Sequence, residues 1–258
     1  MKTRMKKRYV LVPAVILALL LLGKTFFPYL VWLPAMNVTQ TLLGWWPASW
    51  KEEVLLHDGG KIIVKRSQTR GGRHEIGQDV PVNKHTLSVV LPESGKKITW
   101  QTTIGPDLED TELQPLALDI ISGIPYLVTT PMGCIAYNKW KRPNPPYVFL
   151  KYSDNDWQQI PVDELPLQIT KANMVISGFQ LRRERLLSHR FGVVPAEEIT
   201  RINEESKHKE VQYLKVFVRE PLDASFIENL CEKRVLYKGS WILPNDIIGQ
   251  KFIDKQKK

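Results

Sequence analysis

The strongest constraint on the fold is a series of paired short apolar segments between positions 53 and 160. Within each pair, apolar and β-branched residues flank a connection rich in Gly, Asp, Asn or Ser, which is the pattern of a β-hairpin. The pairs are 53–56 with 61–67, 86–91 with 97–103, 116–121 with 125–130, and 147–152 with 157–160. The sequence therefore predicts an antiparallel β-hairpin domain over residues 51–170.

The four hairpins start roughly 30 residues apart, which raises the question of a repeat. The loops between them share no sequence, and a two-stranded unit is smaller than an ordinary four-stranded propeller blade. A meander that forms a sandwich, a barrel or a partial propeller fits the pattern. The predicted fold class is α+β, dominated by antiparallel sheet.

Residues 171–250 mix helical and strand signals, so we expect a small α/β portion packed on the hairpins. The segment 195–206 starts with Pro195 and has Glu197 and Glu198 in its first turn, which favours a helix. Three further segments are predicted as a helix at 180–189, a strand at 212–219 and a hairpin at 236–243. The basic tail, 251–258, is expected to be frayed.

Residues 1–36 have the pattern of a membrane-targeting segment. Five Lys or Arg residues and no acid lie within the first eight positions, and residues 9–22 carry no charge. A helix of this length would reach about 21 Å, less than the roughly 30 Å hydrocarbon core of a bilayer. Lys24 and the aromatic residues that follow it could extend the span to the headgroups. We expect an uncleaved transmembrane helix.

Two alternatives to an uncleaved anchor are a cleaved secretory signal and a segment that lies on the membrane surface. A signal peptide shares the basic start and the short apolar core, but no A-x-A site follows the core here. Basic residues before an uncleaved span would keep the N-terminus in the cytoplasm. The main domain would then lie in the periplasm of a bacterium, at the inner membrane.

An aromatic juxtamembrane segment, 37–50, follows the predicted anchor. It contains Trp45, Trp46 and Trp50. These rings could form an aromatic belt at the membrane interface, or they could pack beneath the globular domain.

The charge of the chain is unevenly distributed. The net charge is +9, but residues 1–36 hold six basic side chains and no acid, which leaves 30 basic against 27 acidic residues for the remainder. The overall basicity therefore reflects the anchor, and we expect no nucleic-acid partner.

Cys134 and Cys231 are the only two cysteines. Outside the cytoplasm such a pair usually forms a disulfide, although two buried free thiols are the alternative. A bridge across 97 positions would stabilise the fold by up to about 4–5 kcal/mol in the chain-entropy model.

Two stretches contain candidate partner-binding residues. The polar run 66–79 surrounds Gly71 and Gly72 with charged side chains, which suits an anion or an acidic partner, or else a solvated loop. The aromatic and basic run 134–166 suits recognition of a protein or sugar, or else a packed sheet, with Trp140 and Arg142 expected to be exposed. The candidates are Arg66, Arg70, Arg73, His74, Glu75, Tyr137, Trp140 and Arg142.

The familiar catalytic and ligand-binding motifs are missing from the sequence. It contains no G-x-S-x-G, no phosphate-binding glycine loop and no H-E-x-x-H. The acidic run 107–112 lacks the glycine and the ligand spacing of a calcium loop. Catalytic residues cannot be assigned, and neither a metal nor a cofactor is predicted.

Three runs, GGRHEIGQ, PYLVTTPMGCIAYNKWKRPNPPYVFLKY and WQQIPVDELP, resemble an uncharacterised family of single-span envelope proteins of Gram-negative bacteria. The resemblance covers roughly residues 45–170. It implies a location at the cell envelope, and it implies no activity, cofactor or catalytic residue.

These patterns together predict a membrane-anchored periplasmic protein without enzymatic activity, acting as a binding or scaffold module. Its expected partners are the membrane and an envelope protein or cell-wall component. The alternative function is an envelope hydrolase or sugar-processing enzyme that uses carboxylates such as Asp107, Asp154 or Glu164.

Overall fold

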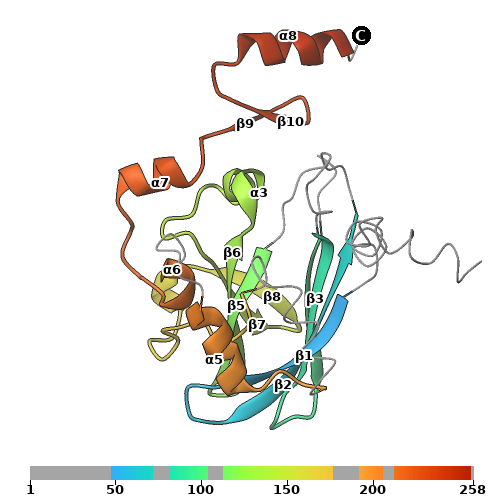
Figure 1. Cartoon of the computed structure of the whole chain (residues 1–258), viewed down its shortest axis with the longest axis vertical. Helices are drawn as coiled ribbons and strands as arrows, with labels where there is room; N and C mark the ends of the chain where they lie inside the picture. The colour runs from blue at the N-terminus through green and yellow to red at the C-terminus, as the bar shows by residue number, and fades with distance from the viewer. Residues whose placement is uncertain (1–47, 72–81, 104–112, 177–191, 206–211, 257–258) are drawn as a thin grey trace, which may run out of the picture. The chain divides into compact units, whose positions relative to one another are not determined.

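The computed structural model describes residues 48–71, 82–103, 113–176, 192–205 and 212–256 (Figure 1). All of them belong to one compact unit that runs from Trp46 to Lys258. The predicted anchor, most of the juxtamembrane segment and the predicted helix at 180–189 lie outside the described residues. Within the described ranges, none of the helices combines the length and the apolar character that a membrane span requires.

The first sheet is an antiparallel meander of four strands, in the order β1-β2-β3-β4. The strands are β1 (Ala48–Leu55), β2 (Lys61–Arg70), β3 (Val82–Val90) and β4 (Lys97–Thr103). Buried and exposed residues alternate along each strand, so one side of the sheet faces the core. Gly59, at φ 86°, occupies the left-handed backbone region in the turn between β1 and β2.

The second sheet is a meander of the same kind, in the order β5-β6-β7-β8. Its strands are β5 (Leu113–Ile121), β6 (Ile124–Pro131), β7 (Val148–Ser153) and β8 (Asp156–Ile160). Most residues of β5 and β6 are buried whichever way they point. Both sides of the second sheet are therefore covered.

The main core lies between the two sheets. Val64 of β2, Leu87 of β3 and Leu118 of β5 belong to one buried hydrophobic cluster, together with buried residues of β1, β4, β6 and β7. Each sheet keeps two edge strands, so the described strands form a two-layered arrangement and neither sheet closes on itself. The β-dominated α+β class and all four predicted hairpins are confirmed.

The outer side of the second sheet has its own core. Leu116, Tyr126 and Phe149 pack there against Leu165, Ile169 and Leu214. The cover consists of the 3-10 turn η1 (Val162–Glu164), the chain that follows it, and helix α6 (Gln212–Lys215). Helix α5 (Ala196–Glu205) confirms the helix predicted at 195–206 and places Ile199 and Ile202 beside Trp50. Trp50 thus packs beneath the domain, the second of the two alternatives for this ring.

The remaining elements are α3 (Gly133–Lys139), α7 (Ala224–Leu230), β9 (Val235–Tyr237), β10 (Ser240–Ile242) and α8 (Ile247–Gln256). The hairpin predicted at 236–243 is confirmed by the pairing of β9 with β10. Two predictions are wrong. Residues 212–215 form the short helix α6, because Leu214 is buried in the second core, and residues 251–256 belong to α8 instead of a frayed tail.

Candidate functional site

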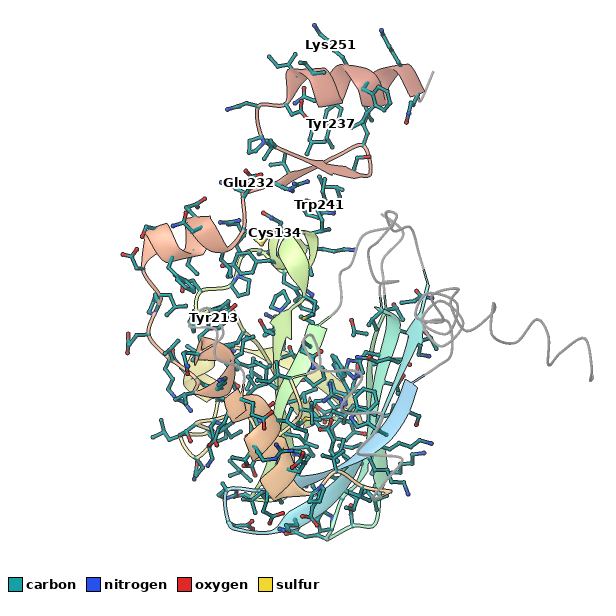
Figure 2. All side chains as sticks on the ribbon, viewed as in Figure 1. Cys134, Tyr213, Glu232, Tyr237, Trp241 and Lys251 are labelled. Atoms are coloured by element: carbon teal, nitrogen blue, oxygen red, sulfur yellow. A yellow bond between two sulfur atoms is a disulfide. The ribbon has the colours of Figure 1, made fainter. Side chains whose placement is uncertain are left out.

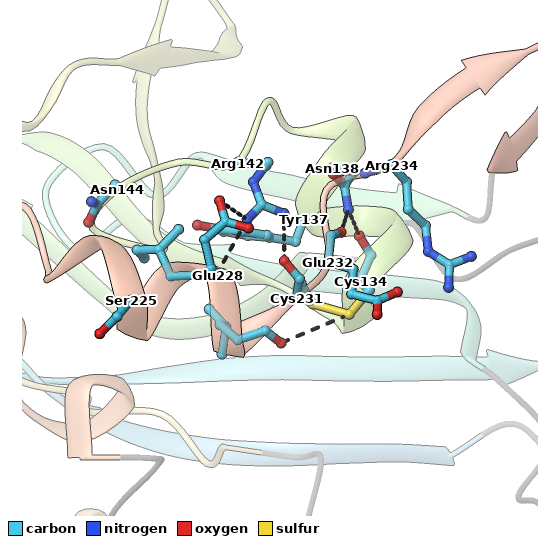
Figure 3. Close-up of polar contacts among 12 residues, drawn as sticks. Cys134, Tyr137, Asn138, Arg142, Asn144, Ser225, Glu228, Cys231, Glu232 and Arg234 are labelled. Atoms are coloured by element: carbon cyan, nitrogen blue, oxygen red, sulfur yellow. Dashed lines mark hydrogen bonds and ion pairs between the residues drawn. A yellow bond between two sulfur atoms is a disulfide. The ribbon is translucent and has the colours of Figure 1, made fainter. Parts of the chain in front are cut away.

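A disulfide joins Cys134 in α3 to Cys231, the residue that follows α7, with their Cα atoms 5.2 Å apart (Figures 2 and 3). The predicted pairing is confirmed. The bridge connects the link between β6 and β7 to the C-terminal residues, which lie 97 positions further along the chain. We call the contacts that residues 134–144 make with residues 222–234 the C-terminal clamp.

Asn138 provides the polar centre of the clamp. Its Nδ2 donates to the carbonyl oxygens of Cys134 at 2.8 Å and Glu232 at 2.9 Å, and its Oδ1 accepts from the backbone N–H of Arg234 at 2.8 Å. The side chain is buried, so all three bonds satisfy polar groups that have left water. Asn138 therefore holds the chain at Glu232 and at Arg234 against α3 (Figure 3).

Arg142, just after α3, attaches α7 and Cys231 to this part of the chain. Its Nη1 donates to the carbonyl oxygen of Cys231 at 2.7 Å, and its Nη2 lies 3.3 Å from Glu228 Oε1 (Figure 3). The guanidinium carbon of Arg142 also lies over the ring of Tyr137, 5.2 Å from the ring centroid. Burial raises the pKa of Tyr137, whose hydroxyl donates to the carbonyl oxygen of Pro143.

The last elements form a small module, which we call the C-terminal module, made of β9, β10 and α8. Asp254 of α8 accepts from Tyr237 Oη at 3.2 Å and from Lys238 Nζ at 2.6 Å, so the helix is attached to the hairpin. Five of the ten exposed large apolar side chains in the described residues belong to this short stretch. They are Leu236, Leu243, Ile247, Ile248 and Phe252.

A buried charged cluster lies on the inner side of the first sheet. Arg66 Nη1 donates to Glu52 Oε1 at 2.8 Å and to the carbonyl oxygen of Val175 at 2.7 Å, and neither charged side chain is exposed to solvent. Glu52 also accepts from Trp50 Nε1 and from the backbone N–H of Val175. Carboxylate and guanidinium are thus surrounded by hydrogen-bonding partners, as buried charges require.

His85 completes this cluster from β3. Arg66 Nε lies 3.2 Å from His85 Nε2, with Nε donating. Burial, with a smaller contribution from the positive charge of Arg66, holds the pKa of His85 well below its ordinary value. The imidazole is therefore neutral near pH 7.

His57 and Asp119 form a second pair, which connects the two sheets. Asp119 Oδ1 lies 2.8 Å from His57 Nδ1, and its Oδ2 accepts from the His57 backbone N–H at 3.0 Å. The two residues are 62 positions apart, so no local motif indicated them. The pair attaches the β1–β2 turn to β5.

The predicted binding residues separate into three groups in the structure. Arg66 is wholly buried, which corrects its assignment to a surface site, because its guanidinium is committed to Glu52 and Val175. Tyr137 is buried and Arg142 is half-buried within the clamp, so the expected exposure of Arg142 is also wrong. Trp140, which was expected to be exposed as well, is half-buried against the main core. The side chain of Arg70 and residues 73–75 lie outside what the structure describes.

The carboxylates considered for catalysis are likewise dispersed. Asp154 is exposed in the β7–β8 turn, Glu164 is exposed in η1, and Asp107 lies outside the described residues. Within the ranges given above, no three His, Cys, Asp or Glu side chains gather closely enough to hold a metal ion.

A scan against protein-family models, and searches of curated proteins and of solved structures, found no match to this chain.

Proposed function

We propose that the chain is a membrane-anchored protein whose folded part lies outside the cytoplasm and serves the cell envelope as a binding or scaffold module, without enzymatic activity. The disulfide carries this proposal, because stable structural disulfides are typical of oxidising compartments. The basic start and the apolar run at 9–22 support an anchor at the inner membrane, with the N-terminus in the cytoplasm.

The C-terminal module is the binding surface in this proposal. Contiguous exposed apolar side chains are uncommon on soluble domains and often mark sites of protein interaction. Ile248 and Phe252 are one helical turn apart on α8, the spacing with which a helix enters an apolar groove. The clamp fixes the chain at Arg234, immediately before the module, so the exposed apolar residues follow a point at which the chain is attached to α3.

The charged residues of α8 indicate what kind of partner would bind it. Lys251 and Lys255 are exposed on α8, whereas Asp254 is already paired with Lys238. The helix thus presents apolar residues flanked by positive charge. The complementary partner is an envelope protein with an apolar groove bordered by carboxylates.

Site-specific photo-crosslinking of the full-length chain in living cells tests this function. A photoreactive residue in place of Ile248 is expected to give one discrete protein adduct, which Phe252→Asp abolishes. The matched control places the same residue at Leu167, which is exposed and apolar but belongs to another part of the chain. Equal adducts from both positions, or none from Ile248, would contradict the proposed role of α8.

A further inference from the structure

The outward side of the first sheet carries three rows of side chains that differ in composition from the rest of the surface. Strand register defines the rows, because residues paired across neighbouring strands point to the same side. All their members are exposed or half-buried. The rows are Thr69, Lys84 and Thr103; Ser49, Ser67, Thr86 and Gln101; and Lys51, Lys65, Ser88 and Thr99. We call these eleven residues the lysine–hydroxyl face.

Among the residues that the structure describes, no carboxylate pairs with the positive charges of the lysine–hydroxyl face. The face itself contains three lysines and no carboxylate. Lys51 and Lys65 stand directly opposite one another on β1 and β2, an arrangement that like charges disfavour. Lys61, at the start of β2 on the same side of the sheet, differs because it pairs with Glu53 and Glu197. An external anion would relieve the repulsion between Lys51 and Lys65.

The chemistry of the face suits phosphate groups. Ammonium groups bind phosphate oxygens strongly, and the surrounding hydroxyls can donate to the same oxygens. The face contains no aromatic ring, since Trp50 and Trp100 point into the core. Single-stranded nucleic acids are usually bound on stacked aromatic rings, so their bases would find no platform here.

The position of the face in the chain indicates where the phosphates come from. The predicted anchor ends at residue 36 and β1 begins at Ala48, so the eleven residues between them span at most about 40 Å. The anchor of the proposed function would therefore keep Ser49 and Lys51 within this distance of the bilayer. We propose that the lysine–hydroxyl face docks on the anionic phospholipid headgroups of the membrane that holds the chain, an inference that rests on the anchor in the proposed function.

Because the anchor already holds the chain at the membrane, weak binding of the lysine–hydroxyl face to headgroups is enough to keep the face docked. Each lysine close to an anionic leaflet strengthens binding about fivefold, so three lysines contribute on the order of a hundredfold. An increase in affinity of about a hundredfold would not be enough to keep an unanchored domain at a membrane. For a tethered domain the headgroups are present at high effective concentration, and docking becomes the dominant state.

Lysine acylation of the full-length chain in lipid nanodiscs tests the inference. The chain is placed in discs of phosphatidylcholine alone and in discs that also contain phosphatidylglycerol, and mass spectrometry measures the acylation rate at each lysine. We expect Lys51, Lys65 and Lys84 to react several-fold more slowly in the anionic discs, and about 0.5 M salt to abolish the difference. Exposed Lys171 and Lys233 are the internal controls.

A variant carrying Lys51→Glu and Lys65→Glu should react at Lys84 equally fast in both kinds of disc. Equal rates at Lys51 and Lys65 of the unmodified chain in the two discs would overturn the inference. The inference would also be overturned if polyphosphate added to neutral discs slowed the acylation of these lysines while anionic discs did not slow it. The ligand would then be a soluble polyanion and not a lipid. A separate measurement asks whether the chain stays bound to neutral discs in high salt. Release of the chain from these discs would contradict the anchor of the proposed function.

Discussion

The Glu52–Arg66 pair illustrates how a single contact can determine the arrangement of several segments. Both side chains are excluded from water, a large cost that their attraction and hydrogen bonds offset. Their partners come from β1, β2 and the chain around Val175, so the cluster is complete only when these segments are correctly placed. The loss of hydration offsets much of the attraction within such a pair, but removal of one partner alone is costly because the other charge stays buried.

Replacement of Arg66 by Met should reduce the free energy of unfolding by about 3–5 kcal/mol, because Glu52 would remain buried without its counter-charge. Urea denaturation of the full-length chain in detergent, followed by tryptophan fluorescence, measures the change. Lys65→Met is the matched control, since Lys65 is the next residue of β2 and points to solvent. If the two variants lost the same stability, the buried pair would not have the role described.

His85 makes stability depend on pH in a definite direction. Its pKa in the folded chain is lower than the ordinary value of about 6.5, so below pH 6.5 the unfolded chain binds a proton that the folded chain does not. Folding stability should fall as the pH is lowered from 7.5 to 5.5, by at most about 1.4 kcal/mol per pH unit. Urea midpoints of the wild type and of His85→Asn across this range check the effect. A variant with the same pH dependence as the wild type would contradict it.

Elements that depend on contacts between residues close in sequence could be predicted, whereas elements that depend on contacts with distant residues could not. The hairpins were predictable because each depends on a local turn, such as the Asp58 carboxylate that accepts from the Gly60 N–H in the β1–β2 connection. The residues of α6 alternate like those of a strand, and only packing against a distant sheet makes them helical. Helix α7 did carry a local signal that was missed, namely Asp223 at its N-cap.

The clamp could be predicted only in part. Two cysteines in one chain indicated the disulfide, but Asn138 and Arg142 bind residues 85–96 positions away, a distance at which sequence spacing carries no information. For the same reason Arg142 was interpreted as a surface residue. Its long polar side chain gives no sign in the sequence that carbonyl groups of α7 will surround it.

Removal of the disulfide should weaken the clamp measurably. The double variant Cys134→Ser and Cys231→Ser is expected to lose about 2–5 kcal/mol of unfolding free energy, because the unfolded chain is no longer constrained. Limited proteolysis should then release the C-terminal module earlier. Reduction of the wild type should reproduce both effects and leave the double variant unchanged. Unaltered stability in the variant would show that the bridge contributes little.

The whole molecule consists of a predicted anchor at residues 1–36 and a folded domain that the structure describes from residue 48. The basic start and the cysteine pair predict a compartment outside the cytoplasm, whereas the two proposed binding surfaces could not be predicted from the sequence. The lysine–hydroxyl face depends on the register of four strands, and the C-terminal module depends on which apolar residues remain uncovered. Both are properties of the folded chain and of no short segment.

The redox state of Cys134 and Cys231 in living cells shows whether the domain lies in an oxidising compartment. Cells that produce the full-length chain are quenched with acid, and free thiols are labelled with a maleimide that increases the mass of the protein. We predict that the wild-type chain takes no label before a reductant is added and two labels afterwards. The Cys134→Ser variant should take one label without reduction, and both chains should be found in the membrane fraction. Two labels without reduction would place the domain in a reducing compartment and contradict the account.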